Sequence, residues 1–409
     1  MASTEGAELL APAAIEAPAP LFARLRRTQP ISQVDASGVY LVATWERIEE
    51  VLAREADFSA HLTGVLIRGP EGRAVTLPLP ESAASQVIAT ADEPAHRVHR
   101  ALVQPRLAAA RVTALEAPIR AWTQHALDPY LGTGGGDFVL IAEQIPARVV
   151  AALLGLPEAD VQRHRTWAML GGAMLAGDLG SQQLAAFARE TREMAAYLGA
   201  HLDAAGHLPR ASGPAPLLAT LADGIAEGRI DRAQAVGIAI VLFGAGGEST
   251  AALIGSAVRR LAGDPELADE LRQAPQLVPR FIEEVVRLET PFKFHYRSVR
   301  RPCQLGEARL GPGDRLMLLW AAANRDPAHF DEPDRLRLDR RHPKRHLGFG
   351  RGSHFCVGAP LARLEARCVV EALLLQSRHL ALLPEDPPVH APSIFVRRLA
   401  RLTLAVEAA

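Results

Sequence analysis

The 409-residue sequence lacks the marks of a secreted, membrane-spanning or nucleic-acid-binding protein. Its three cysteines are odd in number and widely spaced, so they form no paired framework and suit a reducing cytoplasm. A formal net charge of −1 gives no basis for nucleic-acid binding. The first twenty residues lack the basic start and apolar core of a signal peptide. The longest apolar run, residues 235–247, is too short for a bilayer. We therefore expect a cytoplasmic protein with no membrane anchor and no nucleic-acid partner.

Helical periodicity dominates the chain, whose 48% hydrophobic composition is ample for a large core. Apolar spacing predicts helices through most of residues 93–205, and Asp231 with Gln234 predicts a capping box at the start of a long helix. Residues 292–318 are strand-like, and a helix follows at about 357–377. The fold class predicted is mainly α with small β-sheets (α+β).

Three segments rich in small residues, glycine or proline are expected to lie outside regular structure. The Ala/Pro-rich residues 1–20 are interpreted as a mobile N-terminal tail, and residues 21–409 as a single domain. Glycines and prolines in residues 58–90 predict a long loop, and residues 206–216 a connector.

Cys356 is the most informative residue, because it lies among glycines just before an apolar helix. Gly350, Gly352 and Gly358 let the backbone turn around the thiol, so amide N–H groups can point at the sulfur. The positive end of the following helix favours the thiolate, which is a metal ligand. Two other readings stay open: a buried free cysteine, and a zinc site with His354 and Cys368 at spacings unusual for zinc.

The ten residues 349–358 resemble the haem-binding loop of cytochrome P450 enzymes. The family pattern Phe-Gly-x-Gly-x-His-x-Cys-x-Gly is filled at every fixed position, by Phe349, Gly350, Gly352, His354, Cys356 and Gly358. The resemblance implies the cytochrome P450 fold over residues 21–409, with haem b between the long central helix and the cysteine-loop helix. It also implies that Cys356 is the iron ligand and that Phe349, Gly350, His354 and Gly358 contribute to the haem site.

Two further motifs of the family appear in the expected order. Glu284-x-x-Arg287 is similar to the family's buried ion-pair motif, for which Arg340 is the best third member. Residues 96–100 resemble the family's His-x-x-x-Arg helix, which implies that His96 and Arg100 hold a haem propionate. Arg297 matches a third propionate ligand and His354 is placed for the same role. Taken alone, each of these charges would usually be an ordinary surface residue.

Residues 244–250 lie within the long helix and resemble the family's Ala-Gly-x-Asp/Glu-Thr motif through Ala245, Gly246 and Glu248. In isolation, such small residues usually mean close helix packing. Ser249 stands where the family usually has threonine, so a hydroxyl is kept. We expect Glu248 to relay protons and Ser249 to orient them, while a rotation of about 100° per residue should turn Thr250 elsewhere.

The resemblance implies a haem-thiolate monooxygenase that inserts one oxygen atom from O2 into a small organic substrate. The chain carries no flavin or iron–sulfur module, so we expect a separate ferredoxin and an NAD(P)H-linked ferredoxin reductase, and a monomeric enzyme. Alternative outcomes are desaturation, coupling, peroxide-driven oxidation or a non-catalytic haem sensor.

The substrate is expected to be apolar, with pocket walls that include Phe292, Phe294, Ile394 and Phe395. Lys293 and His295 are candidates to meet a polar group, although solvent-facing or structural roles suit them as well. Five arginines are expected to form a basic patch for the ferredoxin, and scattered solvated side chains are the alternative interpretation. These arginines are Arg106, Arg111, Arg351, Arg363 and Arg367.

Overall fold

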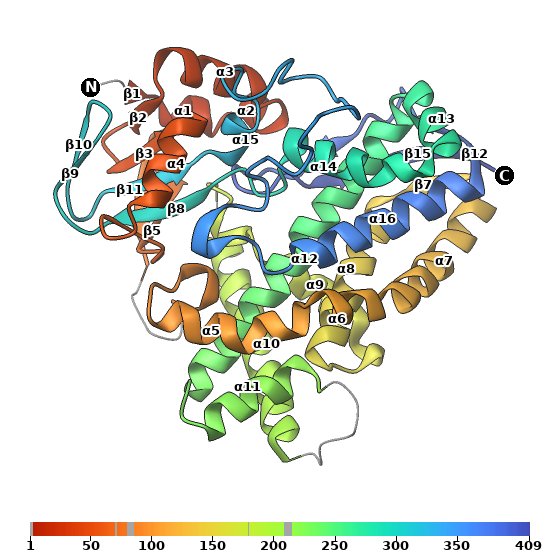
Figure 1. The fold of residues 1–409 in the computed structure, drawn as a ribbon, viewed down its shortest axis with the longest axis horizontal. Coiled ribbons are helices and arrows are strands. Elements are labelled where there is room, and N and C mark those ends of the chain that lie inside the picture. Colours follow the sequence, from red (N-terminus) through yellow and green to blue (C-terminus); the bar gives the residue numbers. More distant parts are fainter. Residues whose placement is uncertain (1–2, 70–71, 80–85, 179, 208–214) are drawn as a thin grey trace.

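The structure, a computed structural model, describes residues 3–69, 72–79, 86–178, 180–207 and 215–409. About 55% of the chain is helical and the rest includes small sheets, which confirms the predicted fold class. Figure 1 shows the largest sheet at one side of the molecule and the long helices on the other, with α12 running through the middle.

The helices before the central one are α1 (Gly6–Leu9), α2 (Pro12–Glu16), α3 (Ala19–Thr28), α4 (Trp45–Ala53), α5 (Ala95–Val103), α6 (Ala109–Ala114), α7 (Glu116–Gly132), α8 (Val139–Leu154), α9 (Val161–Ala168), α10 (Ser181–His207) and α11 (Leu217–Ala226). The later helices are α12 (Arg232–Ala262), α13 (Pro265–Gln273), α14 (Val278–Glu289), α15 (Trp320–Ala323) and α16 (Ala359–Gln376). Short 3₁₀ turns are η2 (Ile88–Thr90), η3 (Gln104–Leu107), η4 (Glu158–Asp160), η5 (Ala173–Leu175), η6 (Pro275–Leu277) and η7 (Gly352–His354).

The largest sheet has six strands, in the order β1 (Ser3–Thr4), β2 (Ile31–Val34), β3 (Val39–Val42), β11 (Arg315–Leu318), β8 (His295–Val299) and β4 (Phe58–Ser59). The smaller sheets pair β5 (Gly64–Arg68) with β6 (Ala74–Pro78), β9 (Cys303–Leu305) with β10 (Ala308–Leu310), β13 (Val389–His390) with β14 (Leu399–Arg401), and β15 (Thr403–Ala408) with both β12 (Ser377–Leu382) and β7 (Gly135–Asp137). In the largest sheet, β11 pairs antiparallel with β8, which places Leu318 opposite His295.

The central helix α12 begins at the predicted capping box. The Asp231 carboxylate accepts from the N–H of Gln234 at 2.7 Å, and the Gln234 side chain accepts from the N–H of Asp231 at 2.9 Å. Among the described helices, α12 alone is long and apolar enough to cross a membrane, and 61% of its most apolar window is buried inside the protein. A helix that is apolar on most sides is typical of a protein core.

The N-terminal segment differs from the predicted mobile tail. Within residues 3–20, β1 pairs with β2, and Leu9 and Leu10 are buried. Glu16 binds the His390 ring, with 2.5 Å between Oε1 and Nδ1. Alanine and proline suggested disorder, but proline at the first turn of a helix and two buried leucines are enough to dock this segment.

Residues 58–90 also differ from the predicted long loop, because β5 and β6 form a hairpin there. Branched apolar residues such as Val65 and Val75 provide the strand pattern, and Gly72 lies beside the turn at a φ of +76°. Residues 70–71 and 80–85 lie outside the described residues. The predicted connector at 206–216 falls largely on residues 208–214, which also lie outside them.

The predicted ion-pair network of α14 is confirmed. Arg287 binds both oxygens of Glu284 at 2.7 and 2.8 Å, and Arg340 lies 2.9 Å from the same carboxylate. Burial opposes ionisation of Glu284, but the hydrogen bonds from these arginines outweigh it and lower its pKa. Arg287 also donates to the carbonyl oxygens of Asn324 and Arg335, so the helix is bonded to the irregular segment after β11.

Candidate functional site

One cavity lies between α12 and α16 and encloses about 1460 Å³ of space not filled by protein atoms, including the part open to solvent. α5, β8 and the cysteine loop also line it. The cavity brings together all but one of the predicted site residues: His96, Arg100, Ala245, Gly246, Ser249, Arg297, Phe349, Gly350, His354, Cys356 and Gly358. The exception is Glu248.

The cysteine loop holds its thiol at one wall of this cavity. Gly350 and Gly352 have φ values of +69° and +76°, a region that glycine adopts without strain. The turn they permit lets the N–H of Cys356 donate to the carbonyl oxygen of Phe349 at 2.9 Å. Burial raises the pKa of the Cys356 thiol, while the N–H groups of Gly358 and Ala359 and nearby arginines oppose that rise. The sulfur is therefore held by backbone donors beside the start of α16.

The basic and imidazole side chains gather at another end of the cavity. The rings of His96 and His354 lie 4.1 Å apart between centroids. His96 Nδ1 is 3.1 Å from a Glu93 oxygen, and Arg100 donates to the carbonyl oxygen of Phe355 at 2.9 Å. Arg297 donates to the carbonyl oxygen of its neighbour Tyr296 and is otherwise directed to the cavity wall.

Two of these groups lack the partners that buried polar groups normally have. The Nδ1 atom of His354 is buried and forms no hydrogen bond within the described residues. Arg297 is 8% exposed and, in the part of the chain that the structure describes, forms no ion pair. Burial lowers the pKa of Arg297 to about 10. A carboxylate bound here would supply the missing acceptor and the missing negative charge, so this end fits a haem propionate.

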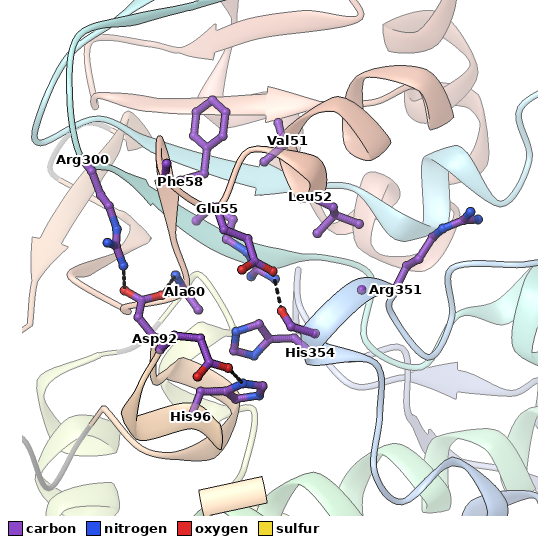
Figure 2. Close-up of a pocket in the computed structure, with 15 residues that line it drawn as sticks. Val51, Leu52, Glu55, Phe58, Ala60, Asp92, His96, Arg300, Arg351 and His354 are labelled. Carbon is purple, nitrogen blue, oxygen red and sulfur yellow. Dashed lines mark hydrogen bonds and ion pairs between the residues drawn. The ribbon is translucent and has the colours of Figure 1, made fainter. Parts of the chain in front are cut away.

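A second pocket adjoins the same group and shares His96, Arg297 and His354 with the larger cavity. It holds about 740 Å³ of unfilled space, again counting space open to solvent. Figure 2 shows the two imidazole rings side by side, with Arg300 reaching Asp92 above them. Charged groups thus surround the propionate end, while the remainder of the larger cavity is mainly apolar.

Helix α12 forms the wall opposite the cysteine loop. Its cavity residues are Val241, Leu242, Ala245, Gly246, Ser249, Thr250 and Leu253. They form two adjacent rows, because consecutive residues lie about 100° apart and each row repeats after four residues. The expectation that Thr250 points elsewhere is therefore wrong: the cavity is wide enough to contact both Ser249 and Thr250.

Ser249 and Glu248 differ in what they face. The Ser249 hydroxyl lies at the cavity wall and donates to the carbonyl oxygen of Ala245 at 2.6 Å, one turn back in the helix. Glu248 faces away from the cavity, where it accepts from the N–H of Gly172 at 2.7 Å and lies 3.4 Å from the Arg398 guanidinium. Burial raises the pKa of Glu248, and Arg398 and the Gly172 amide only partly oppose this.

The predicted apolar wall is present in part. Phe292 lines the cavity and stacks on Phe395 with 4.5 Å between ring centroids, whereas Phe294 and Ile394 are buried beyond it. Lys293 does not meet the cavity. Its ammonium group donates to the carbonyl oxygen of Ser393 at 2.8 Å, and burial lowers its pKa to about 7.

The sequence did not point to two polar side chains of the cavity wall, those of Trp320 and Glu365. Trp320 lines the cavity and donates through its indole N–H to Nδ1 of His295 at 2.7 Å. Glu365 on α16 is 2% exposed, its Oε2 has no partner among the described residues, and burial raises its pKa well above the usual range. The one local signal for Glu365 is its place on the apolar face of α16, because its residue type alone does not separate it from the exposed acids of a surface helix.

Three of the arginines expected to form a basic patch are neutralised by carboxylates. Arg351 lies 3.0 Å from Glu49, Arg363 binds Glu283 at 2.6 Å, and Arg367 lies 2.9 Å from Glu116. A fourth, Arg106, donates to the Thr220 hydroxyl at 2.7 Å. The positive charge of this surface is therefore smaller than the sequence suggests.

Comparisons with known proteins agree with this geometry. A family model described as Cytochrome P450 matches residues 217–398. Cytochrome P450 144 of Mycobacterium tuberculosis is 40% identical over 399 residues, covering 96% of this chain and 90% of the relative. Mycinamicin IV hydroxylase/epoxidase of Micromonospora griseorubida is 30% identical over 367 residues, covering 86% of each.

Solved structures share the whole architecture. The crystal structure of CYP109E1 from Bacillus megaterium, in complex with testosterone, superposes with a TM-score of 0.84 at 26% identity and covers 96% of this chain and 98% of that one. CYP109Q5 from Chondromyces apiculatus gives a TM-score of 0.83 at 28% identity, covering 100% and 99%.

Proposed function

The chain belongs to the cytochrome P450 family of haem-thiolate monooxygenases, and from this premise we propose that it inserts one oxygen atom from O2 into a small, mainly apolar organic substrate. The observation that carries the proposal is the cavity itself. Its charged side chains gather at the propionate end, and its remaining wall is mainly apolar and includes Ile88, Leu107, Val150, Leu153, Val241, Leu242, Leu253 and Phe292. Such a pocket favours the binding of apolar ligands of moderate size.

We propose haem b as the cofactor, with Cys356 as its iron ligand and His96, Arg100, Arg297 and His354 around its propionates. The orphan Nδ1 of His354 and the unpaired Arg297 support this. The sequence has no Cys-x-x-Cys-His segment, and Cys303 and Cys368 do not line the cavity, so no thiol is placed to attach the haem covalently. When bound, haem supplies the reductive activation of O2, and a thiolate ligand promotes O–O cleavage.

Two residues of α12 are proposed to deliver the proton that the reaction needs. We propose that Ser249 orients a proton at the cavity wall and that Glu248 supplies it from behind α12. Burial raises the pKa of Glu248, which favours the protonated form that a proton donor needs, and its contacts with Gly172 and Arg398 fix its position on the far side of the helix. Removing the hydroxyl in Ser249→Ala should lower the product formed per reduced cofactor, whereas Thr250→Val serves as the neighbouring control.

Electrons are proposed to come from a ferredoxin and an NAD(P)H-linked ferredoxin reductase, with the enzyme acting as a monomer in the cytoplasm. Phe355, which precedes the ligand cysteine, is 42% exposed and brings the surface close to Cys356. Because most of the nearby arginines are paired, we expect reduction to depend only modestly on salt. Within the described residues only five large apolar side chains are exposed, and they come from separate parts of the chain, which favours a monomer.

A ligand screen tests the proposed substrate class. Steroids, fatty acids and cyclic ketones are added to the haem-loaded enzyme, and the shift of the Soret band from low to high spin is measured. Several apolar ligands should shift the band, and purely ionic ligands should not. The ferrous–CO spectrum checks the ligand: the wild type should show the red-shifted thiolate band, and Cys356→Ser should lose it. A screen in which only highly polar ligands bind contradicts the proposal.

A further inference from the structure

His295 is a polar group on the otherwise apolar part of the cavity wall, and the propionate end does not account for it. It is the first residue of β8, two residues before Arg297, and it lines the cavity together with Phe292 and Trp320. Its side chain is partly exposed although the strand around it is buried. The exposed part of the His295 side chain borders the cavity.

A hydrogen bond from Trp320 fixes which nitrogen of His295 carries the proton. The indole N–H of Trp320 can only donate, so Nδ1 of His295 must be the acceptor in their 2.7 Å contact. A neutral imidazole then carries its proton on Nε2. The strand register sets this contact, because His295 lies opposite Leu318 and Trp320 begins α15 two residues later.

Aromatic packing keeps the ring from turning away. Phe292 and Phe395 both meet it edge to face, with centroid distances of 5.8 and 5.6 Å and interplanar angles of 85° in each case. These two phenylalanines are stacked on each other, so the ring of His295 is held in a rigid aromatic corner. Within the described residues, no hydrogen bond from Nε2 to the protein accompanies the one at Nδ1.

The ring also stays neutral. Burial and the nearby Arg297 lower the pKa of His295 to about 3, so the imidazole is uncharged near neutral pH. The result is a fixed, uncharged N–H donor on an otherwise apolar wall. A ligand that fills the cavity takes this donor out of contact with solvent, so a ligand that supplies an oxygen acceptor at this point binds better than one that leaves the donor unpaired.

We propose that His295, locked by Trp320, is a specificity-determining residue that donates a hydrogen bond to a neutral oxygen of the substrate, such as a ketone, ester or ether. This rests on the proposed function and names its substrate class more narrowly: an apolar molecule that carries one acceptor oxygen. The same donor chemistry would serve an oxygen of a haem propionate, and the experiment separates the two sources.

The experiment compares matched ligand pairs that differ only in a carbonyl oxygen: adamantanone with adamantane, and cyclododecanone with cyclododecane. Dissociation constants are taken from the spin-state shift of the haem-loaded enzyme. The wild type should bind each ketone about 5-fold or more tightly than its hydrocarbon, as one hydrogen bond implies. His295→Phe keeps the ring and removes the donor, so it should lose this preference and keep its affinity for the hydrocarbons.

His295→Gln is the matched rescue. Its amide oxygen can accept from Trp320 and its amide N–H can donate to the ligand, so it should restore much of the ketone preference. Trp320→Phe frees the ring and should weaken the preference without abolishing hydrocarbon binding. If His295→Phe does not fold, the contrast between the Gln and Trp320 variants still decides the question.

The outcomes separate the two proposals. An unchanged ketone preference in His295→Phe overturns the role of His295 and leaves the proposed apolar pocket standing. The same result with faster haem loss from His295→Phe assigns the donor to a propionate, which also overturns it. If neither member of any pair binds the wild type, the proposed substrate class fails and this inference fails with it.

Discussion

Two neighbouring regions bury charged and polar side chains, but one pairs them fully and the other leaves several without a partner among the described residues. Around α14, Glu284 and Arg287 are 0% and 1% exposed, and every strong donor and acceptor between them finds a protein partner. In the cavity, His354 Nδ1 and Glu365 Oε2 have no partner among the described residues, and Arg297 has no carboxylate. The fully paired network stabilises the fold, while the open groups mark where a ligand completes the structure.

Breaking the paired network should give the largest effect. Arg287→Ala leaves the buried Glu284 carboxylate without its main partner and removes donors to the carbonyl oxygens of Asn324 and Arg335. The free energy of unfolding should fall by about 3–5 kcal/mol, as for other buried ion pairs that lose one member. Urea unfolding followed by circular dichroism measures it.

Arg232 provides the control, because its 2.7 Å ion pair with Asp203 has both side chains more than half exposed. Arg232→Ala should leave the free energy of unfolding close to the wild-type value, since solvent already screens this pair. Similar losses in the Arg232 and Arg287 variants would contradict the assignment of the α14 network as the stabilising one.

The sequence could anticipate the paired network and the cysteine loop but not the orientation of single side chains. The loop of residues 349–358 is a contiguous pattern, and Glu284 with Arg287 shares one helical turn, so local spacing suffices. The direction of Glu248 depends on Gly172 and Arg398, which lie 76 and 150 residues away. No local pattern contains those contacts.

The same limit explains the other differences. Thr250 reaches the cavity because the hollow spans two rows of α12, a width that no single helix reveals. The docking of the N-terminal segment depends on His390, far along the chain, which binds Glu16. The sequence marks His295 as a polar candidate, but its proposed donor role depends on the strand register that brings Trp320 to it.

Removing a group that has no protein partner should leave the free energy of unfolding of the apoprotein unchanged or raise it, whereas removing a member of the α14 network lowers it. His354→Leu deletes an orphan nitrogen, so the apoprotein should be as stable as the wild type or slightly more stable. The haem-loaded protein should instead lose a hydrogen bond to a charged propionate, and haem should dissociate about 10-fold faster. Transfer of haem to excess apomyoglobin gives the rate.

His125, exposed on α7, supplies the matched control, and His125→Leu should change neither quantity. A strongly destabilised apoprotein of His354→Leu would mean that His354 stabilises the fold as the α14 network does. That result would contradict its assignment as an unpaired group.

Glu365 gives the smallest and most specific test, because its carboxyl borders the cavity but lies outside the motifs of residues 96–100, 244–250, 284–287 and 349–358. Burial raises its pKa, so the folded apoprotein holds a proton to higher pH than the unfolded chain does. Stability is therefore unaffected below the unfolded pKa of about 4.3 and falls as pH rises toward the folded pKa. Glu365→Gln cannot titrate, so its advantage over the wild type should grow from pH 5 to pH 8. The expected gain is about 1 kcal/mol, the size of the contribution of one hydrogen-bonding group.

Glu371, on the same helix, tests whether this gain comes from burial rather than from any loss of an acid. Its carboxylate is paired with Arg120 at 2.7 Å, so Glu371→Gln should slightly lower stability near neutral pH, the opposite sign. Thermal unfolding of the apoproteins at both pH values measures the difference. A pH-independent gap between Glu365→Gln and the wild type would show that the Glu365 carboxyl is as well satisfied as Glu284, and the cavity would then differ from the α14 network only at its propionate end.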